Sequence, residues 1–427
     1  MNERVSASDA RRIVRALRYG ATPSEFADRI FVGQAKWLEQ AVIMSCHTAE
    51  DGDFEVRFVR AAYGGGKTLF LKRLEQDVTE RNWVTAYVLL KHGSVDLDKF
   101  ETVAAELCRQ LVLPKGGRGL LALLEIALQE IGKTCGYEQS RSSSFATHER
   151  VIERVNEICL RKGIGYDMTL ALRGACRSFL SKNSMQIKLG ARWLAGGPDK
   201  LLIPGMHVGD RSPDVALKPL GVGAADQLLR LIAVLVREAG YAGLLIAIDE
   251  LELISGLPPK RRANAFQTLR GLVDQNDSQL LPPSTCLFLA ATPQMFEDRE
   301  MFPSYKALQD RIESLPVLGA RKQINYRAPV IDLDATELQS SELYELGERI
   351  IGFYELGGES VPTDARERLK ELVNAVTSRR YVIARPRLLC RCVVEMLEGS
   401  LGQDLSQELA ARNEEMLRNR QKEVLGS

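Results

Sequence analysis

The fold of this chain is decided by residues 54–68, FEVRFVRAAYGGGKT, in which an apolar run leads into a glycine-rich turn. A helix-forming run follows from Lys67 to Asn82. Strand, glycine turn, Lys-Thr pair and helix, in this order, are the parts of a phosphate-binding loop. In such a loop the backbone N–H groups of the turn and the positive end of the helix dipole face a phosphate. We therefore predict that this turn binds the phosphates of a nucleotide.

The expected contacts to a nucleotide fall on the consecutive residues of the turn and the start of the helix: Tyr63, Gly64, Gly65, Gly66, Lys67, Thr68 and Leu69. Lys67 would reach the β- and γ-phosphates, and the Thr68 hydroxyl would complete the shell of a Mg²⁺ ion. Ala61 stands where the usual pattern has its first glycine, and a methyl group is tolerable there if the residue keeps a negative φ. Taken alone, the stretch also fits a glycine-rich hairpin turn.

A second motif is LLIAIDE at residues 244–250. An uninterrupted apolar run of this length predicts a strand that is buried on both faces of a parallel sheet. Its carboxylates come at the C-terminal end, where open α/β sheets bind ligands. We expect Asp249 to hold Mg²⁺ and Glu250 to act as the base that polarises the attacking water. Together with the Gly-Lys-Thr turn, this pair predicts a site for ATP and Mg²⁺.

A third apolar run, TCLFLAA at residues 285–291, ends at Thr292 and Pro293. In the AAA+ class of P-loop ATPases, the strand beside the Asp-Glu strand ends in a polar sensor near the γ-phosphate, and Thr292 resembles that sensor. The alternative is that Thr292 only opens a Thr-Pro turn.

The composition is that of an ordinary globular protein, with 45% hydrophobic and 26% charged residues among 427 and a net charge of +1. We find no apolar stretch long enough for a bilayer, and the first residues lack a signal-peptide core. The eight cysteines form no C-x-x-C pair and the four histidines no i, i+4 pair. We therefore expect a cytoplasmic protein with reduced thiols, without a zinc site and without a membrane partner.

The sequence predicts an α/β fold, a P-loop NTPase (AAA+-like) three-layer sandwich with a large helical insertion and a C-terminal helical lid. The insertion follows from a stretch that is almost wholly helical and far longer than a normal connection between strand and helix. The expected units are a helical N-terminal segment (1–50), the first part of the core (51–98), the insertion (99–240), the second part of the core (241–334), the lid (335–400) and a helical tail (401–427).

Several short sequence motifs together resemble those of the BrxD-like ATP-binding proteins of bacterial BREX phage-defence systems, a branch near the origin-recognition-type AAA+ ATPases. The similarity extends roughly from Ala10 to Leu397. The motifs on which the similarity rests are IVRALRYG (13–20), YGGGKTLF (63–70), GYD (165–167), RWL (192–194), DELE (249–252), LRGLVD (269–274) and ATPQMF (291–296).

This resemblance implies an AAA+-type ATPase that self-assembles or works beside a DNA-handling partner such as a helicase in antiviral defence. It places Gly33, with Val32, near the adenine. Arg311 resembles the arginine finger that is offered to a neighbouring subunit. Arg387 resembles the lid arginine that senses the γ-phosphate, although the nearby Arg385 makes that assignment ambiguous.

Three functions remain open at this point: an ATPase that acts on DNA or a DNA-bound partner, a nucleotide-loaded scaffold with negligible hydrolysis, and a small-molecule kinase. The intact Lys-Thr and Asp-Glu pairs favour the ATPase. A DNA backbone contact is the hypothesis for Lys260, Arg261 and Arg262, which follow the Asp-Glu strand. The alternative is that these cations pair with acidic neighbours such as Glu252 or keep a helix start soluble.

Overall fold

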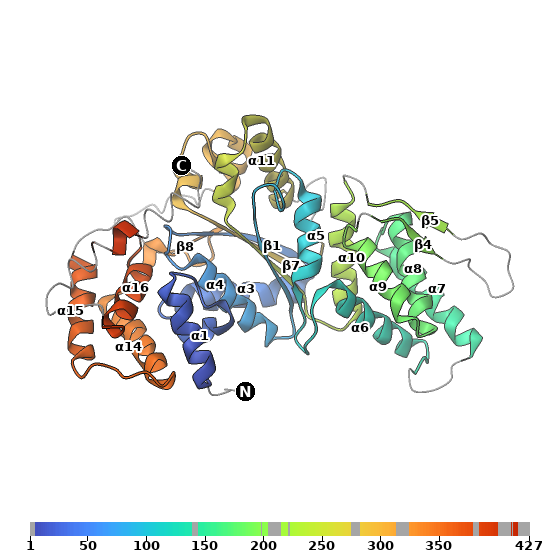
Figure 1. Ribbon diagram of the computed structural model, residues 1–427. Helices are drawn as coiled ribbons and strands as arrows, with labels where there is room; N and C mark the ends of the chain where they lie inside the picture. Colours follow the sequence, from blue (N-terminus) through green and yellow to red (C-terminus); the bar gives the residue numbers. More distant parts are fainter. Residues whose placement is uncertain are drawn as a thin grey trace.

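The computed structural model describes residues 5–138, 144–197, 199–203, 215–220, 223–274, 282–312, 324–378, 384–399, 411 and 413–416. A central sheet lies between two groups of helices, one near the C-terminus of the chain and one from its middle (Figure 1). Most of the predicted tail, residues 401–427, lies outside the described residues.

The central sheet has six strands in the order β3-β2-β6-β7-β1-β8, and only β3 runs antiparallel to its neighbour. The strands are β1 (Phe54–Arg60), β2 (Val84–Leu89), β3 (Leu111–Val112), β6 (Leu244–Asp249), β7 (Thr285–Ala291) and β8 (Val330–Asp332). The apolar runs therefore form parallel strands, as predicted. Strand β7 lies between β1 and β6, so the residues that follow these strands meet at one edge of the sheet.

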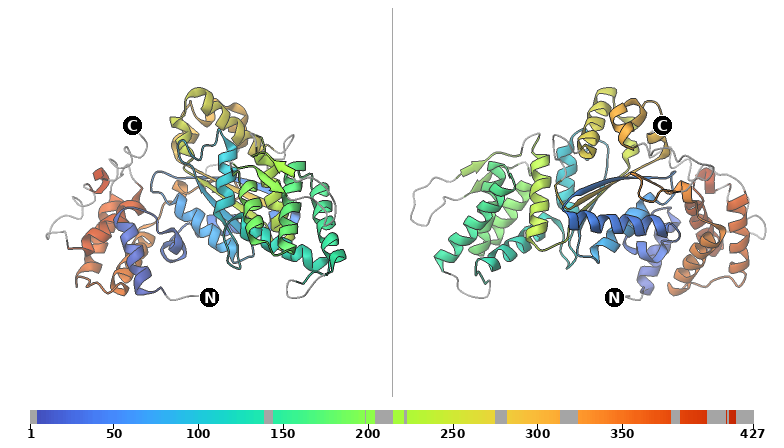
Figure 2. Two further views of the ribbon diagram at one scale, coloured as in Figure 1. Left: turned by 45° about the vertical axis from the view of Figure 1, so that its right-hand side comes forward. Right: turned by 180° about the vertical axis from the view of Figure 1, so that it is seen from behind.

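Both faces of the sheet are buried, and alternate residues of a strand belong to different cores. In β6, Ile246 and Ile248 belong to one core, whereas Leu245 and Ala247 belong to the other. Helices α3 (Ala35–Asp51) and α4 (Lys67–Thr79) contribute to the second core. The first core includes residues of α5 (Phe100–Gln110), α10 (Ala225–Glu238) and α11 (Pro259–Val273). Figure 2 shows the sheet between these helices from two further sides.

The middle of the chain forms a helical group beside the sheet. It consists of α6 (Gly119–Thr134), α7 (Phe145–Arg161), α8 (Tyr166–Leu180), α9 (Ser184–Leu194) and a hairpin of β4 (Leu201–Ile203) and β5 (Val215–Leu217). The hairpin and β3 were not predicted, because strands of two or three residues are too short for a periodic pattern. Helix α5 packs on β2 and β3 joins the sheet, so contact with the sheet continues beyond residue 99.

A second helical bundle contains α14 (Ser340–Leu356), α15 (Ala365–Ser378) and α16 (Arg385–Leu397), and it also contains α1 (Ala7–Arg18) from the other end of the chain. Ile13 and Leu17 of α1 share a core with Ile350 of α14 and Val393 of α16. The α1 helix begins with a capping box between Ser6 and Asp9, which satisfies its first N–H groups. The N-terminal segment is thus split, with α1 in the bundle and α3 on the sheet.

Short helices complete the described chain. They are η1 (Ser24–Phe26), α2 (Ala27–Ile30), η2 (Leu251–Gly256), α12 (Pro293–Glu297), η3 (Phe302–Ser304), α13 (Lys306–Ile312) and η4 (Asp334–Thr336). Among the described residues, none of the helices has the length and apolar character that crossing a membrane would require.

Candidate functional site

The glycine turn connects β1 to α4 at the C-terminal edge of the sheet. Gly64 and Gly66 have φ values of 81° and 96°, which favour glycine. A methyl group on Gly64 would also lie 2.6 Å from the Cδ atom of Arg387. Because the residue before α4 is Gly66, no side chain caps the first N–H groups of the helix. The turn therefore offers unshielded backbone donors at a helix N-terminus, as a phosphate site requires.

Ala61, in place of the usual first glycine, is fully buried and is not among the residues with a positive φ. Its methyl group therefore costs no backbone strain. It does crowd the turn, since a Cβ atom on Gly65 would lie 2.9 Å from the Cβ of Ala61. The Ala61 carbonyl accepts a hydrogen bond of 3.1 Å from Lys67 Nζ, which holds this buried ammonium against the turn.

Two hydroxyl groups converge on one carboxylate oxygen of Asp249 beside the turn. The Thr68 hydroxyl donates to Asp249 Oδ2 over 2.6 Å, and the Tyr87 hydroxyl donates to the same oxygen over 2.7 Å. Asp249 is 1% exposed, and its Oδ1 accepts the N–H of Glu250. A hydroxyl and a carboxylate are hard oxygen ligands of the kind that Mg²⁺ takes, so Thr68 and Asp249 fit this ion. When bound, Mg²⁺ would supply positive charge against the phosphates.

Glu250 adopts a left-handed backbone conformation, with φ 66° and ψ 41°. Such a conformation costs a non-glycine residue about 1–3 kcal/mol and is concentrated at functional sites. Burial raises the pKa of Glu250 to about 7, helped by repulsion from Glu252 and Asp249 and opposed by Lys67 and Arg387. A carboxylate with a pKa near neutrality suits a general base.

Sequence reasoning missed Glu252 as a member of this site. Its Oε1 lies 3.6 Å from Lys67 Nζ, and both side chains are buried. Its Oε2 is buried without a hydrogen-bond partner in the described part of the chain, and burial raises the pKa of this carboxyl. The only available signal was its position two residues beyond Glu250.

Asp334 was also missed. It follows β8, and its Oδ2 accepts the N–H of Ala62 over 2.8 Å. A polar residue just beyond a parallel strand was the available signal. The contact of Tyr87 with Asp249 could not be predicted from a sequence motif, because it depends on the pairing of β2 with β6.

Two adjoining cavities flank the turn. The larger, of about 390 Å³, is lined mainly by apolar side chains and by the backbone of the turn; its lining includes Ile30, Val32, Gly65, Gly66, Leu69, Leu338 and Leu346. The smaller, of about 140 Å³, is lined by residues that include Tyr63, Gly64, Lys67, Thr68, Glu250 and Arg387. Both cavities have apolar lining residues, and the smaller one also contains the side chains of Lys67, Thr68 and Glu250. A base in the larger cavity and phosphates in the smaller one would fit this arrangement.

Gly33 lies beside the larger cavity, between the lining residues Val32 and Gln34. Its φ is 65°, and a Cβ atom there would lie 2.2 Å from Leu338 Cδ2. Only glycine allows this close approach between the segment before α3 and the segment before α14. Gly33, where we expect an adenine contact, thus lies next to the larger cavity.

The two arginines at the start of α16 face different partners. The Arg387 guanidinium lies 4.3 Å from the centre of the Tyr63 ring, and its Nε is buried with no partner among the described residues. Arg385 forms an ion pair of 2.7 Å with Glu337 and lines the larger cavity. Of the two, Arg387 lines the smaller cavity together with Glu250.

Thr292 directly follows β7, whose last residue Ala291 pairs with Arg60 of β1. It therefore lies at the same edge of the sheet as the turn and the Asp-Glu pair. Arg311 lies elsewhere: on α13 it forms an ion pair with Asp274, and it lines neither of the two cavities.

The cations at the start of α11 are largely neutralised. Arg261 pairs with Asp98 over 2.7 Å and with Asp96 over 3.1 Å, and Arg262 pairs with Glu300 over 3.4 Å. The structure thus favours ion pairing over phosphate contact for these two arginines. Glu252, the partner named from the sequence, instead faces Lys67.

Comparison with known protein families matches residues 5–408 to the family described as "BREX system ATP-binding protein BrxC/D". Neither the curated proteins nor the solved structures provide a match to the chain. The family match spans nearly the whole chain, including the turn, the Asp-Glu pair and both helical groups. The chain therefore belongs to the BrxC/D family of ATP-binding proteins of the BREX phage-defence system.

Proposed function

We propose that this protein hydrolyses ATP in a Mg²⁺-dependent reaction and uses the cycle in anti-phage defence. The observation that carries the proposal is the convergence of Thr68 and Asp249 over 2.6 Å beside Lys67, with Glu250 as the next residue. A protein that only binds ATP needs the loop and the lysine. A carboxylate with a pKa near 7 at this position adds a base for water.

In the proposed reaction, Glu250 takes a proton from a water molecule, whose oxygen forms a bond to the γ-phosphorus. The bond between this phosphorus and the β–γ bridging oxygen breaks, leaving ADP and inorganic phosphate. Lys67, the N–H groups of the turn and Arg387 compensate the charge on the phosphate oxygens. Thr292 orients the γ-phosphate from the end of β7.

We further propose an AAA+-like organisation, in which residues 99–240 are an insertion and residues 335–400 a lid. The position of Arg387, on the first turn of α16 and in the smaller cavity with Lys67 and Glu250, supports a bundle that responds to nucleotide. The cycle then acts on DNA or on a DNA-handling partner such as a helicase, through self-assembly or a hetero-complex.

Self-assembly predicts a specific effect of Arg311. If Arg311 reaches a γ-phosphate in a neighbouring subunit, Arg311→Ala should lower turnover about tenfold or more without weakening ATP binding, because one charge-assisted contact is worth about 1.5–3 kcal/mol. Turnover per subunit of the wild type should rise with protein concentration. Steady-state phosphate release over a concentration series measures both.

The matched control is Arg270→Ala. Arg270 also pairs with Asp274, over 2.9 Å, so its loss breaks an ion pair with the same carboxylate as the loss of Arg311 does. The Arg270 variant should keep wild-type turnover. Equal losses in the two variants, or a turnover per subunit that is independent of concentration, would reduce Arg311 to a salt-bridging residue.

The raised pKa of Glu250 predicts a pH dependence. Below pH 7 the carboxyl is increasingly protonated and cannot accept a proton, so kcat/KM for ATP should fall as the pH drops through about 7. Glu252→Gln removes a nearby negative charge, lowers the pKa of Glu250 and should move this acid limb to lower pH. Phosphate release across a pH series tests the shift; an acid limb that stays in place would assign it to another group.

A further inference from the structure

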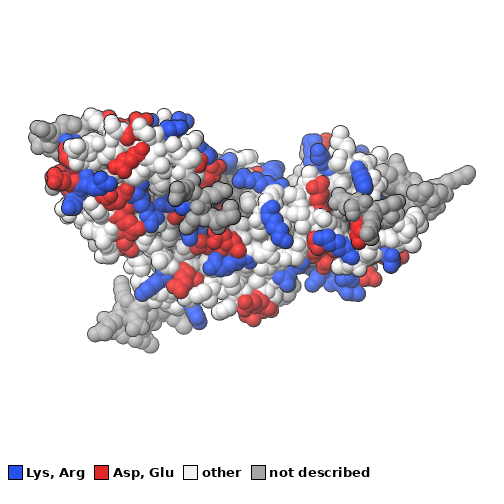
Figure 3. Space-filling model, turned by 90° about the horizontal axis from the view of Figure 1, so that it is seen from below, with Lys and Arg blue, Asp and Glu red and all other residues white. Residues whose placement is uncertain are grey.

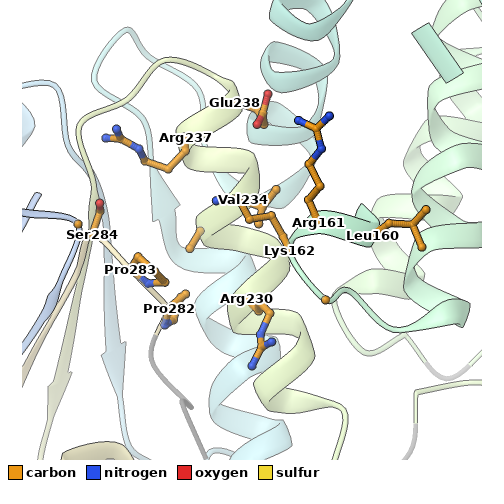
Figure 4. A pocket seen from close by; sticks show the side chains of 13 residues that line it. Leu160, Arg161, Lys162, Arg230, Val234, Arg237, Glu238, Pro282, Pro283 and Ser284 are labelled. Atoms are coloured by element: carbon orange, nitrogen blue, oxygen red, sulfur yellow. The ribbon is translucent and has the colours of Figure 1, made fainter. Parts of the chain in front are cut away.

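A third cavity, larger than the two beside the glycine turn, lies at the opposite edge of the sheet from the nucleotide site. It has a volume of about 650 Å³ and lies between the end of α7, the α10 helix and the residues that precede β1 and β7 (Figure 4). Gly52 and Ser284, which line it, come before Phe54 and Thr285, the first residues of β1 and β7. We call this cavity the basic groove, because Arg161, Lys162, Arg230 and Arg237 line it, and Glu238 is the single acidic residue among its described lining residues.

The charge of the basic groove is poorly compensated. The side chains of Arg230 and Lys162 have no ion-pair or hydrogen-bond partner among the described residues. The Arg161 guanidinium lies 3.6 Å from a carboxylate oxygen of the exposed Glu157, and such an exposed ion pair contributes little. The Arg230 guanidinium lies against Gly163, where a Cβ atom would come within 3.2 Å of it. This contrasts with the start of α11, where Arg261 is paired with two aspartates.

Not every cation of the basic groove needs a ligand to explain it. Arg237 donates to the carbonyls of Ala242, over 2.6 Å, and Tyr241, over 3.3 Å, and so closes the turn after α10. Arg161 lies in the last turn of α7, where a cation also favours the helix dipole. Arg230 and Lys162 have no such role, and Figure 4 shows them on facing walls, one on α10 and one beyond α7.

We propose that the basic groove binds the sugar-phosphate backbone of a nucleic acid. Cations on two facing walls match a chain of spaced phosphates, and arginine is well suited to phosphate oxygens. Among the described residues that line the groove, none is aromatic and could stack on a base, so the contact should be independent of sequence. On the face shown in Figure 3, acidic and basic side chains are interspersed.

This inference rests on the proposed action on DNA and names the surface for it. The groove also has a direct connection to the nucleotide site. The α10 helix, which carries Arg230, leads through a short turn into β6, which ends at Asp249. The two sites are therefore at opposite ends of one strand, and none of the lining residues given for the groove lines either cavity beside the glycine turn.

The test is the affinity for fluorescein-labelled duplex DNA of random sequence, measured by anisotropy across a salt series. The triple variant Arg161→Ala, Lys162→Ala, Arg230→Ala should bind more weakly. Its log–log salt slope should be less steep by about 0.9 for each cation that leaves a phosphate. ATP binding should be unchanged, which shows that the variant is folded.

The matched control removes three exposed cations outside the groove, each paired with a glutamate of α5, α6 or α14, in Arg109→Ala, Lys133→Ala, Arg366→Ala. It should keep the wild-type affinity and slope. If the groove variant binds DNA like the wild type, the proposal that the groove binds DNA is wrong, but the proposed action on DNA is not contradicted. A wild-type chain that binds no DNA would overturn both, and ATP turnover would still report separately on hydrolysis.

Discussion

Lys67→Ala should reduce ATP affinity about 100-fold or more. The Lys67 ammonium is buried beside the turn, in a cavity that it shares with Thr68 and Glu250. Two charge-assisted contacts, to the β- and γ-phosphates, are together worth about 3 kcal/mol or more, and each 1.4 kcal/mol is a factor of ten. Titration with a fluorescent ATP analogue measures the loss.

Two further variants make this result interpretable. Arg73→Ala removes a cation of the same helix that pairs with Asp77 over 2.8 Å, and it should leave ATP affinity unchanged. Lys67→Ala also strips Glu252 of its cation, so Lys67→Ala combined with Glu252→Gln avoids an unpaired buried carboxylate. Wild-type ATP affinity in either folded Lys67 variant would contradict the assignment of the nucleotide site to this turn.

Glu250→Gln should lower turnover by about 10²–10⁴-fold, the usual loss when a general base is removed. ATP should still bind, because the glutamine keeps the size of the side chain and leaves Thr68 and Asp249 in place. Phosphate release and ATP retention, measured on the same preparation, separate the two effects. The variant should therefore hold ATP for longer than the wild type does.

The neighbouring Glu252 provides the comparison. Glu252→Gln should keep substantial turnover above neutral pH, because Glu252 faces Lys67 rather than the end of β6. If Glu252→Gln abolished hydrolysis and Glu250→Gln did not, the two carboxylates would exchange roles.

The sequence predicts the sheet well for a physical reason. Strands that are buried on both faces are continuous apolar runs, and the runs that lead to Asp249 and Thr292 are confirmed as β6 and β7. The run from Phe54 to Arg60, in which apolar residues alternate with Glu55 and Arg57, is confirmed as β1. The packing of α1 against α14 and α16 could not be predicted in this way. It joins the two ends of the chain, and amphipathic spacing shows which face of α1 is apolar but not which partner covers it.

The candidate site divides in the same manner. Thr68 and Asp249 were predicted to act on one ion, and the structure brings them together although they are far apart in sequence. The ion pair of Arg261 with Asp98 is equally distant but carries no motif, and the sequence analysis could not identify this partner. Sequence motifs predict which side chains converge on a ligand. Ion-pair partners that come together only through packing can be identified only once the fold is known.

The alternative to hydrolysis is a scaffold that binds ATP and keeps it. The side chains argue against this alternative, since a scaffold has no use for a base with a pKa near 7 in a strained conformation beside the turn. The alternative is nevertheless distinct in its outcome. A scaffold leaves the bound nucleotide as ATP, and a hydrolase converts it.

The fate of bound ATP in the wild-type protein is therefore the most direct test. The full chain is incubated with Mg²⁺ and ATP labelled at the α-phosphate, freed of excess nucleotide, and sampled over time for ATP and ADP. We predict that the bound ATP is converted to ADP, and that Glu250→Gln retains it as ATP. Bound nucleotide that persists as ATP in the wild type, alone and with DNA, would contradict hydrolysis at this site.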